Sequence, residues 1–383
     1  MSRLRTREIL ADLVAFDTTS RNSNLPLLDY VRSYLDSHGV ASRLVFDATG
    51  QKANLWATIG PETDGGIVLN GHTDCVPVDD EVWASDPFVL TEREGRLYGR
   101  GAADMKGFLA SVLALVPDLV AHGASRPIHL AFSHDEEVGC VGVRSLLADI
   151  RQNGPKPAFC IVGEPTSMRV VNGHKGGRGY RCVVTGLEAH SSLAPRGVNA
   201  IHYAAKLIVF ITELAGELAQ GPFDPEFDVG HSTISTGLIE GGVAVNIVPN
   251  RCAFTFEYRN LLEVDQQAIF DRIRNHAENV LLPQMQAVFA AASIEFLPIY
   301  EYPAHAIDAE HPLVTTVKGI VRSNAHSKVA FGAEAGLFSR ELALPSILCG
   351  PGDIAVAHKP DEFVPIDDLA ACDDFLRALC IGD

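Results

Sequence analysis

The chain has 383 residues, of which 47% are hydrophobic, and its formal net charge is −17. This length and composition predict a folded protein of two or three domains and exclude a disordered chain. The acidic charge argues against nucleic acid or an anionic membrane as a partner, and no apolar run approaches the roughly 20 residues that span a bilayer.

The first part of the chain alternates helical and extended patterns. Helical periodicity predicts helices at residues 6–16, 27–39, 105–123 and 141–150. Short apolar runs predict strands at residues 41–46, 54–60, 66–72, 128–137 and 158–165. In two of these segments, 128–137 and 158–165, the strand passes into a loop. Strands that alternate with helices predict an α/β domain with a mainly parallel sheet flanked by helices.

The pattern changes near Gly176. Strands at 180–186, 232–242 and 251–259 and helices at 199–218 and 264–282 predict a smaller α+β module. After 293–303 the α/β rhythm resumes and ends in a helix at 367–380. We therefore predict a main domain formed by 1–177 and 293–383, interrupted by an inserted α+β domain at 178–292.

Ionisable side chains follow several predicted strands. His72 and Asp74 follow one strand, Glu136 and Glu137 another, Glu164 a third and His358 a fourth, while Asp104 lies in a glycine-rich loop before a helix. Functional groups in open α/β sheets collect beyond the carboxyl ends of the strands. Imidazole and carboxylate ligands without a thiolate suit zinc, cobalt or manganese in a catalytic role.

Each of these residues has an ordinary interpretation when it is taken alone. A histidine after a strand is usually a surface residue, adjacent carboxylates are common on solvated faces, and Glu164 or Asp104 could be a turn or helix-cap residue. The prediction rests on the set. Carboxylates crowded at one sheet edge repel each other unless a cation lies among them.

The segments GHTDCVPVDDEVWASDPF, LYGRGAADMKG, DEEVG, GEPTS, AHSS, NIVPN and GPGDIAVAHKPDEF together resemble the dinuclear zinc aminoacylase and carboxypeptidase family. The resemblance covers nearly the full chain. It implies a zinc-exopeptidase-like fold, two Zn²⁺ ions per subunit that Co²⁺ can replace, and an inserted domain that acts as a lid and in dimerisation.

The resemblance also implies residue roles. Asp104 would bridge both metals, His72 and Glu164 would complete one site, and Glu137 and His358 the other. The implied functional roles are a general base (Glu136), a carboxylate supporting His72 (Asp74), an oxyanion-stabilising histidine that reaches a neighbouring active site across a homodimer (His190), and substrate-binding residues (Asn246 and Arg259).

Within the family, VGEPTS followed by GHKG, and PRGVNAI after AHSS, are similar to the acetylornithine deacetylase branch. This likeness implies a small-molecule substrate, N-acetylornithine, cleaved to ornithine and acetate in arginine biosynthesis. Ala333 departs from the branch, which has threonine before the glutamate, so the acyl-ornithine specificity stays open. A desuccinylase, a dipeptidase or carboxypeptidase, or another N-acyl amino acid deacylase would share the metal site.

A silent binding or scaffold relative would need a broken ligand set, whereas the five expected ligands and Glu136 are all present. The N-terminus turns polar too early for a secretory signal, and the eight scattered cysteines form no CxxC pair. We therefore expect a cytoplasmic enzyme with reduced, buried thiols.

Overall fold

The computed structural model describes residues 2–382, which divide into two compact units. The first unit contains the residues up to Gly173, His305–Lys328 and the residues from Ala333 onward, and the second contains His174–Ala304 and Val329–Gly332. The second unit extends beyond the predicted end at residue 292 because the next strand, β14 (Ser293–Tyr302), pairs with β9 (Gly176–Thr185) of that unit.

A nine-stranded sheet forms the centre of the first unit. Its order is β1-β2-β6-β3-β7-β17-β8-β15, and β16 pairs with β8. The strands are β1 Ser42–Phe46, β2 Ala53–Ile59, β3 Ile67–His72, β6 Ile128–Ser133, β7 Phe159–Pro165, β8 Val171–His174, β15 His305–Ala306, β16 Ser327–Val329 and β17 Ser346–Gly350. Four neighbours, β6, β3, β7 and β17, run parallel, so the sheet is mixed with a parallel centre.

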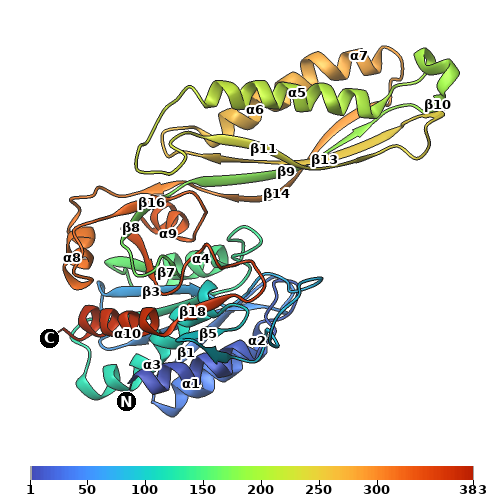
Figure 1. Cartoon of the computed structure of the whole chain (residues 1–383). Helices are drawn as coiled ribbons and strands as arrows, with labels where there is room; N and C mark the ends of the chain where they lie inside the picture. Colours follow the sequence, from blue (N-terminus) through green and yellow to red (C-terminus); the bar gives the residue numbers. More distant parts are fainter. Residues whose placement is uncertain (1, 383) are drawn as a thin grey trace. The chain divides into compact units, whose positions relative to one another are not determined.

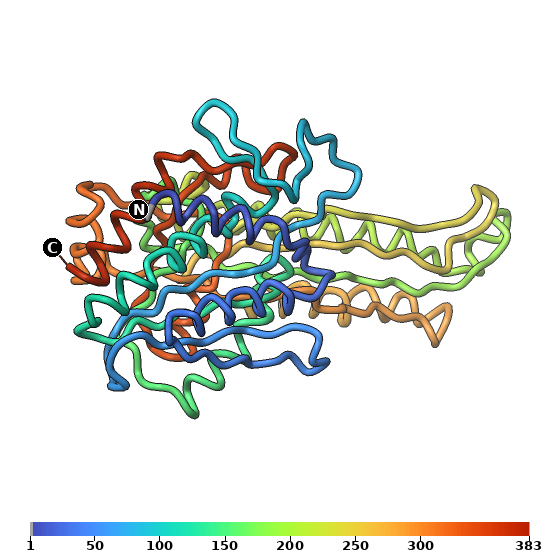
Figure 2. Tube along the Cα trace, turned by 90° about the horizontal axis from the view of Figure 1, so that it is seen from below, coloured from blue at the N-terminus to red at the C-terminus, as the bar shows by residue number. Residues whose placement is uncertain are grey.

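Helices and a small second sheet complete this unit. The helices are α1 Ser2–Val14, α2 Leu25–Ser37, α3 Gly107–His122, α4 Val143–Asn153, α8 Pro312–Ile320, α9 Ala335–Leu342 and α10 Ile366–Cys380, and the second sheet has the order β18 (Phe363–Pro365), β5 (Arg96–Tyr98), β4 (Thr91–Arg93). Helices α1, α3 and α10 pack together, which brings the two ends of the chain close to each other (Figure 2). Arg3 of α1 and Asp374 of α10 form an exposed ion pair of 3.0 Å.

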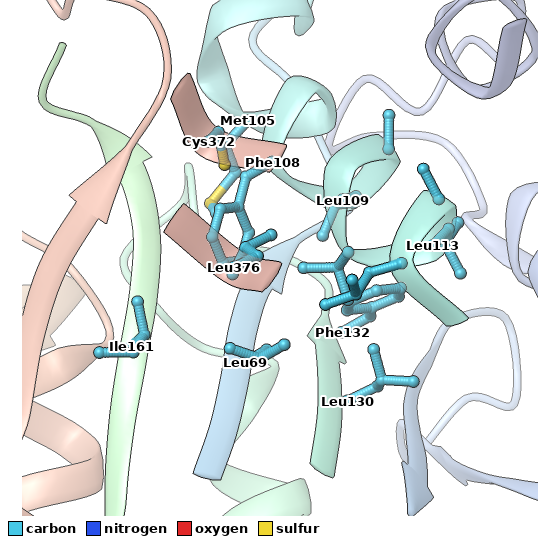
Figure 3. Close-up of a cluster of buried hydrophobic side chains, with 14 of the residues drawn as sticks. Leu69, Met105, Phe108, Leu109, Leu113, Leu130, Phe132, Ile161, Cys372 and Leu376 are labelled. Atoms are coloured by element: carbon cyan, nitrogen blue, oxygen red, sulfur yellow. The ribbon is translucent and has the colours of Figure 1, made fainter. Parts of the chain in front are cut away.

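The core of the first unit lies between the parallel strands and α3 with α10. Leu69 of β3 and Leu130 and Phe132 of β6 are fully buried among the side chains of Phe108 and Leu109, as Figure 3 shows. All eight cysteines are buried and free, as the scattered spacing predicts.

The segment that contains α3 is more apolar than the sequence analysis expected. Ala102–His122 is long and apolar enough to cross a membrane by length and composition, although no such run was expected. However, 72% of its most apolar window is buried inside the structure. A central core helix has this property because the sheet and the neighbouring helices cover most of its surface.

The second unit contains a four-stranded antiparallel sheet covered on one face by helices (Figure 1). The strand order is β11 (Thr233–Gly241), β13 (Arg251–Asn260), β9, β14, and the helical segments are α5 Ala200–Leu218, α6 Gln266–His276, η3 Ala277–Leu281 and α7 Leu282–Gln286. Tyr180 of β9 stacks on Phe270 of α6 with ring centroids 4.1 Å apart, which anchors that helix to the sheet. A two-stranded sheet, β10 (Ala189–His190) with β12 (Ile247–Val248), and the short helix η2 (Ser191–Arg196) complete the unit.

Candidate metal centre

The predicted ligands gather at one edge of the large sheet. His72 is the last residue of β3, Glu164 is the last but one of β7, and the Glu136–Glu137 pair follows β6. His358 lies in the loop after β17 and has a φ of +58°, an uncommon value for a residue other than glycine. Because β6, β3, β7 and β17 are adjacent and parallel, their carboxyl ends meet at the same edge.

Asp104 reaches this edge from an irregular segment of the backbone directly before α3. The short segment η1 (Ala102–Lys106) is not regular at Asp104, whose φ and ψ are −120° and 91°. Gly101 precedes it with a φ of +78°, a conformation that glycine adopts without strain. Because the backbone is irregular here, the buried carboxylate of Asp104 faces the ends of the strands instead of projecting from a regular helix.

Two groups of potential ligands share the Asp104 carboxylate. The ligand atoms of His72, Asp104 and Glu164 lie within 4.8 Å of one another, and so do those of Asp104, Glu137 and His358. Asp104 Oδ1 is 3.0 Å from His72 Nε2, and Asp104 Oδ2 is 3.2 Å from His358 Nε2. His358 Nε2 is also 3.0 Å from Glu137 Oε2. Each oxygen of Asp104 therefore faces one histidine, which is the geometry expected of a ligand shared by two cations.

The orientation of the His72 ring leaves one nitrogen for a metal. Its Nδ1 lies 2.9 Å from the main-chain carbonyl oxygen of Asp74, and the Asp74 carboxylate is farther away, with Oδ1 at 3.6 Å. A carbonyl oxygen only accepts hydrogen bonds, so Nδ1 carries the proton of this contact. Nε2, which lies 3.0 Å from Asp104 Oδ1, is then the nitrogen whose lone pair would bind a metal ion.

The Asp74 carboxylate holds the loop that carries the two adjacent glutamates. It accepts hydrogen bonds from the main-chain N–H groups of Glu136 at 3.2 Å and of Glu137 at 3.3 Å, and from the Ser20 hydroxyl at 2.8 Å. Asp74 therefore contacts His72 through its backbone and orders the Glu136–Glu137 loop through its side chain. The spacing of two residues from His72 gave no sign of this second contact.

The charges of the site are those of a cation-binding site. Burial raises the pKa of Glu136 to about 8 and that of Glu137 to about 7, and neighbouring carboxylates add to both shifts. Burial and Asp104 also raise the pKa of Glu164, and its buried Oε1 atom has no hydrogen-bond partner among residues 2–382. Such an orphaned oxygen is costly unless a ligand satisfies it.

The histidines respond in the opposite sense. Burial alone would lower the pKa of His72, but Asp104 and Asp74 raise it well above its usual value. Hydrogen bonds to Asp104 and Glu137 raise the pKa of His358 to about 11. The site therefore attracts positive charge, and its nitrogen and oxygen donors fit a pair of divalent cations.

Another buried carboxyl group lies behind the strand ends and was missed as a functional candidate. Glu334 Oε2 accepts hydrogen bonds of 2.8 Å from the side chains of Asn70 and Ser133, which belong to β3 and β6. Ala333, the departure from the deacetylase branch, is fully buried beside it. The motif FGAEAG could have identified Glu334 as buried, but not its partners.

The three residues predicted in the inserted segment lie in two places in the second unit. His190 pairs with Ile247 across β10 and β12, and the N–H of Ser191 donates to Asn246 O at 2.9 Å, so His190 and Asn246 are neighbours and both are exposed. Arg259 lies near the other end of β13, eight residues beyond Arg251, which is roughly 26 Å of strand.

Arg259 is held by its own neighbours. Its guanidinium donates to Glu257 at 3.0 Å and lies 5.6 Å from the ring centroid of Tyr302. The structure therefore brings two of the three predicted residues together and leaves Arg259 apart from them within the same unit.

The chain is similar over most of its length to proteins of one known family. The profile of "Peptidase family M20/M25/M40" matches residues 68–381. An acetylornithine deacetylase from Myxococcus xanthus is 32% identical over 382 residues, which cover 97% of this chain and 95% of the relative.

Two solved structures share the fold. A di-peptidase from Saccharomyces cerevisiae superposes with a TM-score of 0.77 at 13% identity, covering 98% of this chain and 95% of that one. The YXEP protein of Bacillus subtilis, described as a dinuclear metal binding peptidase from the M20 family, superposes with a TM-score of 0.68 at 16% identity, covering 99% and 97%. The chain belongs to peptidase family M20/M25/M40 and is a metal-dependent hydrolase.

Proposed function

We propose that this chain removes the acyl group from an N-acyl amino acid, with N-acetylornithine as the favoured substrate and two Zn²⁺ ions, replaceable by Co²⁺, as cofactors. The observation that carries the proposal is the sharing of Asp104 by two groups, each of which adds one histidine and one glutamate. In this assignment His72 and Glu164 complete one metal site, and Glu137 and His358 complete the other.

When bound, two such ions polarise the amide carbonyl and lower the pKa of a water molecule towards neutrality. The chain supplies the proton transfers. Glu136 belongs to neither ligand group and lies beside Glu137, so its carboxylate accepts the proton of the attacking water and returns it to the leaving amine. The Cys140 thiol donates to Glu136 Oε1 at 3.2 Å, which leaves the other oxygen for this exchange.

The choice of substrate rests on the relatives. The Myxococcus protein, similar over nearly the whole chain, carries the name acetylornithine deacetylase. By this analogy the reaction would release ornithine for arginine biosynthesis in the cytoplasm. Asn246 and Arg259 are the proposed contacts to the substrate carboxylate and carbonyl oxygens, and His190 the proposed donor to the oxyanion. The buried Ala333 is the position at which specificity for another acyl amino acid would first arise.

We further propose that the active form is a homodimer. The supporting geometry lies within the second unit, where Arg259 is separated from His190 and Asn246 by roughly 26 Å of β13. A small N-acyl amino acid does not span that distance. If all three residues contact one substrate molecule, two chains must contribute them.

A substrate panel tests the function. The purified protein, stripped by chelation and reloaded with Zn²⁺ or Co²⁺, is assayed on N-acetylornithine, N-acetylcitrulline, N-acetylmethionine, N-succinyl-diaminopimelate and simple dipeptides. We expect activity only after reloading, and the highest kcat/KM on N-acetylornithine. Preference for another member of the panel would refute the substrate while keeping the hydrolase. Full metal loading without hydrolysis of any amide would favour the silent binding relative instead.

A further inference from the structure

A fully buried ion pair lies next to the metal centre and has no assigned role. The Arg100 side chain has no solvent exposure, and its Nη1 donates to Glu362 Oε2 at 2.9 Å, where the glutamate is 1% exposed. The other guanidinium nitrogen, Nη2, donates to Glu81 at 2.5 Å, and the guanidinium lies 5.0 Å from the ring centroid of Trp83. Removing such a pair from water costs free energy, so a buried ion pair by itself contributes little to the stability of the fold.

The contacts of Arg100 join three separate stretches of the chain. Its two terminal nitrogens donate to the carbonyl oxygens of Pro77 and Lys359, each at 3.3 Å. Pro77 lies in the loop that leaves β3 after His72, and Lys359 directly follows His358. A planar guanidinium is suited to this task because its five N–H donors have fixed directions.

The Glu362 carboxylate completes the connection at the segment that carries Asp104. Oε2 accepts from the N–H of Gly101 at 3.0 Å, and Oε1 accepts from the N–H groups of Ala103 at 2.9 Å and Asp104 at 3.1 Å. Three backbone donors of the Gly101–Asp104 segment therefore converge on one buried carboxylate. The bridging Asp104 is fixed by a residue that lies only four positions after His358.

We propose that Arg100 and Glu362 are positioning residues that hold Asp104 against His358 and so set the affinity of the metal site formed by Asp104, Glu137 and His358. The inference rests on the proposed metal assignment. Both sites share Asp104, but the other site takes its two further ligands, His72 and Glu164, from strands β3 and β7, which the sheet already fixes. The pair therefore acts mainly on the site that contains His358. His358 and Glu137 both lie on loops and need an additional support.

Stepwise metal titration of the full-length protein tests the proposal. Glu362→Gln keeps the shape of the side chain but replaces one acceptor oxygen with an N–H₂ donor, which then faces other N–H groups. Arg100→Lys keeps the positive charge but loses the planar guanidinium that contacts Pro77, Lys359 and Glu362 together. Calorimetric titration of the metal-free protein with Zn²⁺, together with measured metal content, should show the first ion bound as in the wild type and the second bound about 10- to 100-fold more weakly.

Asp361→Asn is the matched control. It alters the neighbouring carboxylate, which forms a half-exposed ion pair of 3.4 Å with Arg93 and does not reach the Asp104 segment. We expect two ions with wild-type affinities. Circular dichroism and uptake of the first ion establish that each variant is folded. Because the two test variants remove different partners, a folding failure in one leaves the other to decide.

The outcomes separate this inference from the proposed function. A wild-type protein that binds no ions would contradict the metal sites themselves. If the wild type binds two ions, then unchanged binding of the second ion in folded Glu362→Gln and Arg100→Lys proteins, or equal weakening of both ions, would overturn the positioning role alone.

Discussion

The Asp74→Asn substitution separates two ways in which this residue could support catalysis. Asp74 is 2% exposed, and its carboxylate accepts three hydrogen bonds, from the N–H groups of Glu136 and Glu137 and from the Ser20 hydroxyl. Asparagine keeps one acceptor oxygen and presents an amide N–H₂ group in place of the other. At least one main-chain N–H of the glutamate loop then loses its partner.

The size of the effect follows from these contacts. A buried donor left without a partner costs about 1–3 kcal/mol, which is enough to let the Glu136–Glu137 loop shift. Displacement of a catalytic group by about 1 Å lowers turnover about 10²-fold. The carbonyl oxygen that holds His72 belongs to the backbone and is unchanged by the substitution. We therefore expect kcat to fall about 100-fold while the site of His72, Asp104 and Glu164 keeps its metal.

Steady-state kinetics and metal analysis on the same samples measure both quantities. Asp79→Asn serves as the control. Asp79 lies a few residues after Asp74, but it is exposed and its carboxylate accepts a hydrogen bond of 3.0 Å from Arg21 Nη2. Loss of the metal with turnover per bound metal unchanged would show that Asp74 acts through His72. Wild-type kcat in Asp74→Asn would refute the reasoning altogether.

Further predictions concern the base, the shared ligand, one loop ligand and the pH dependence of stability. Glu136→Gln should keep its metal content and lose about 10²–10⁴ in kcat, and near-native turnover would remove Glu136 from its role. Asp104→Asn should weaken the binding of both ions in a metal titration, whereas His358→Ala should weaken only one. Burial lowers the pKa of His129 to about 4 from its ordinary 6.5, so the unfolded chain takes up a proton first as the pH falls. The free energy of unfolding should therefore fall by about 1.4 kcal/mol between pH 8 and pH 5.5. His129→Gln should lack this contribution in urea titrations at the two pH values, and identical pH dependence in both proteins would contradict it.

Several features of the site were predictable because they depend on local sequence. A short apolar run ending in His72 predicts a buried strand, and the ligand then lies at its carboxyl end. The same reasoning located the Glu136–Glu137 pair after β6 and Glu164 at the end of β7. The orientation of these residues towards a common point follows from the parallel pairing of adjacent strands.

The boundary of the inserted segment was less predictable. The run Ser293–Tyr302 has the pattern of a strand, but the pattern does not say which sheet it joins. Pairing with β9 assigns it to the second unit. Hydrogen bonding between strands is set by backbone geometry that many sequences satisfy equally, so pairing partners are not encoded in one strand alone.

The amino-acid sequence by itself determined the chemistry of this protein. It shows which metal-binding side chains are present, which predicted strands they follow, and which family the chain resembles. Only the tertiary structure decided which groups hold those donors in place. Arg100 and Glu362 are 262 positions apart, and Asp74 reaches the N–H of Glu137 from 63 positions away. Periodicity reports the surroundings of a residue along its own helix or strand, whereas these contacts arise only when loops from different strands converge at one edge of a sheet.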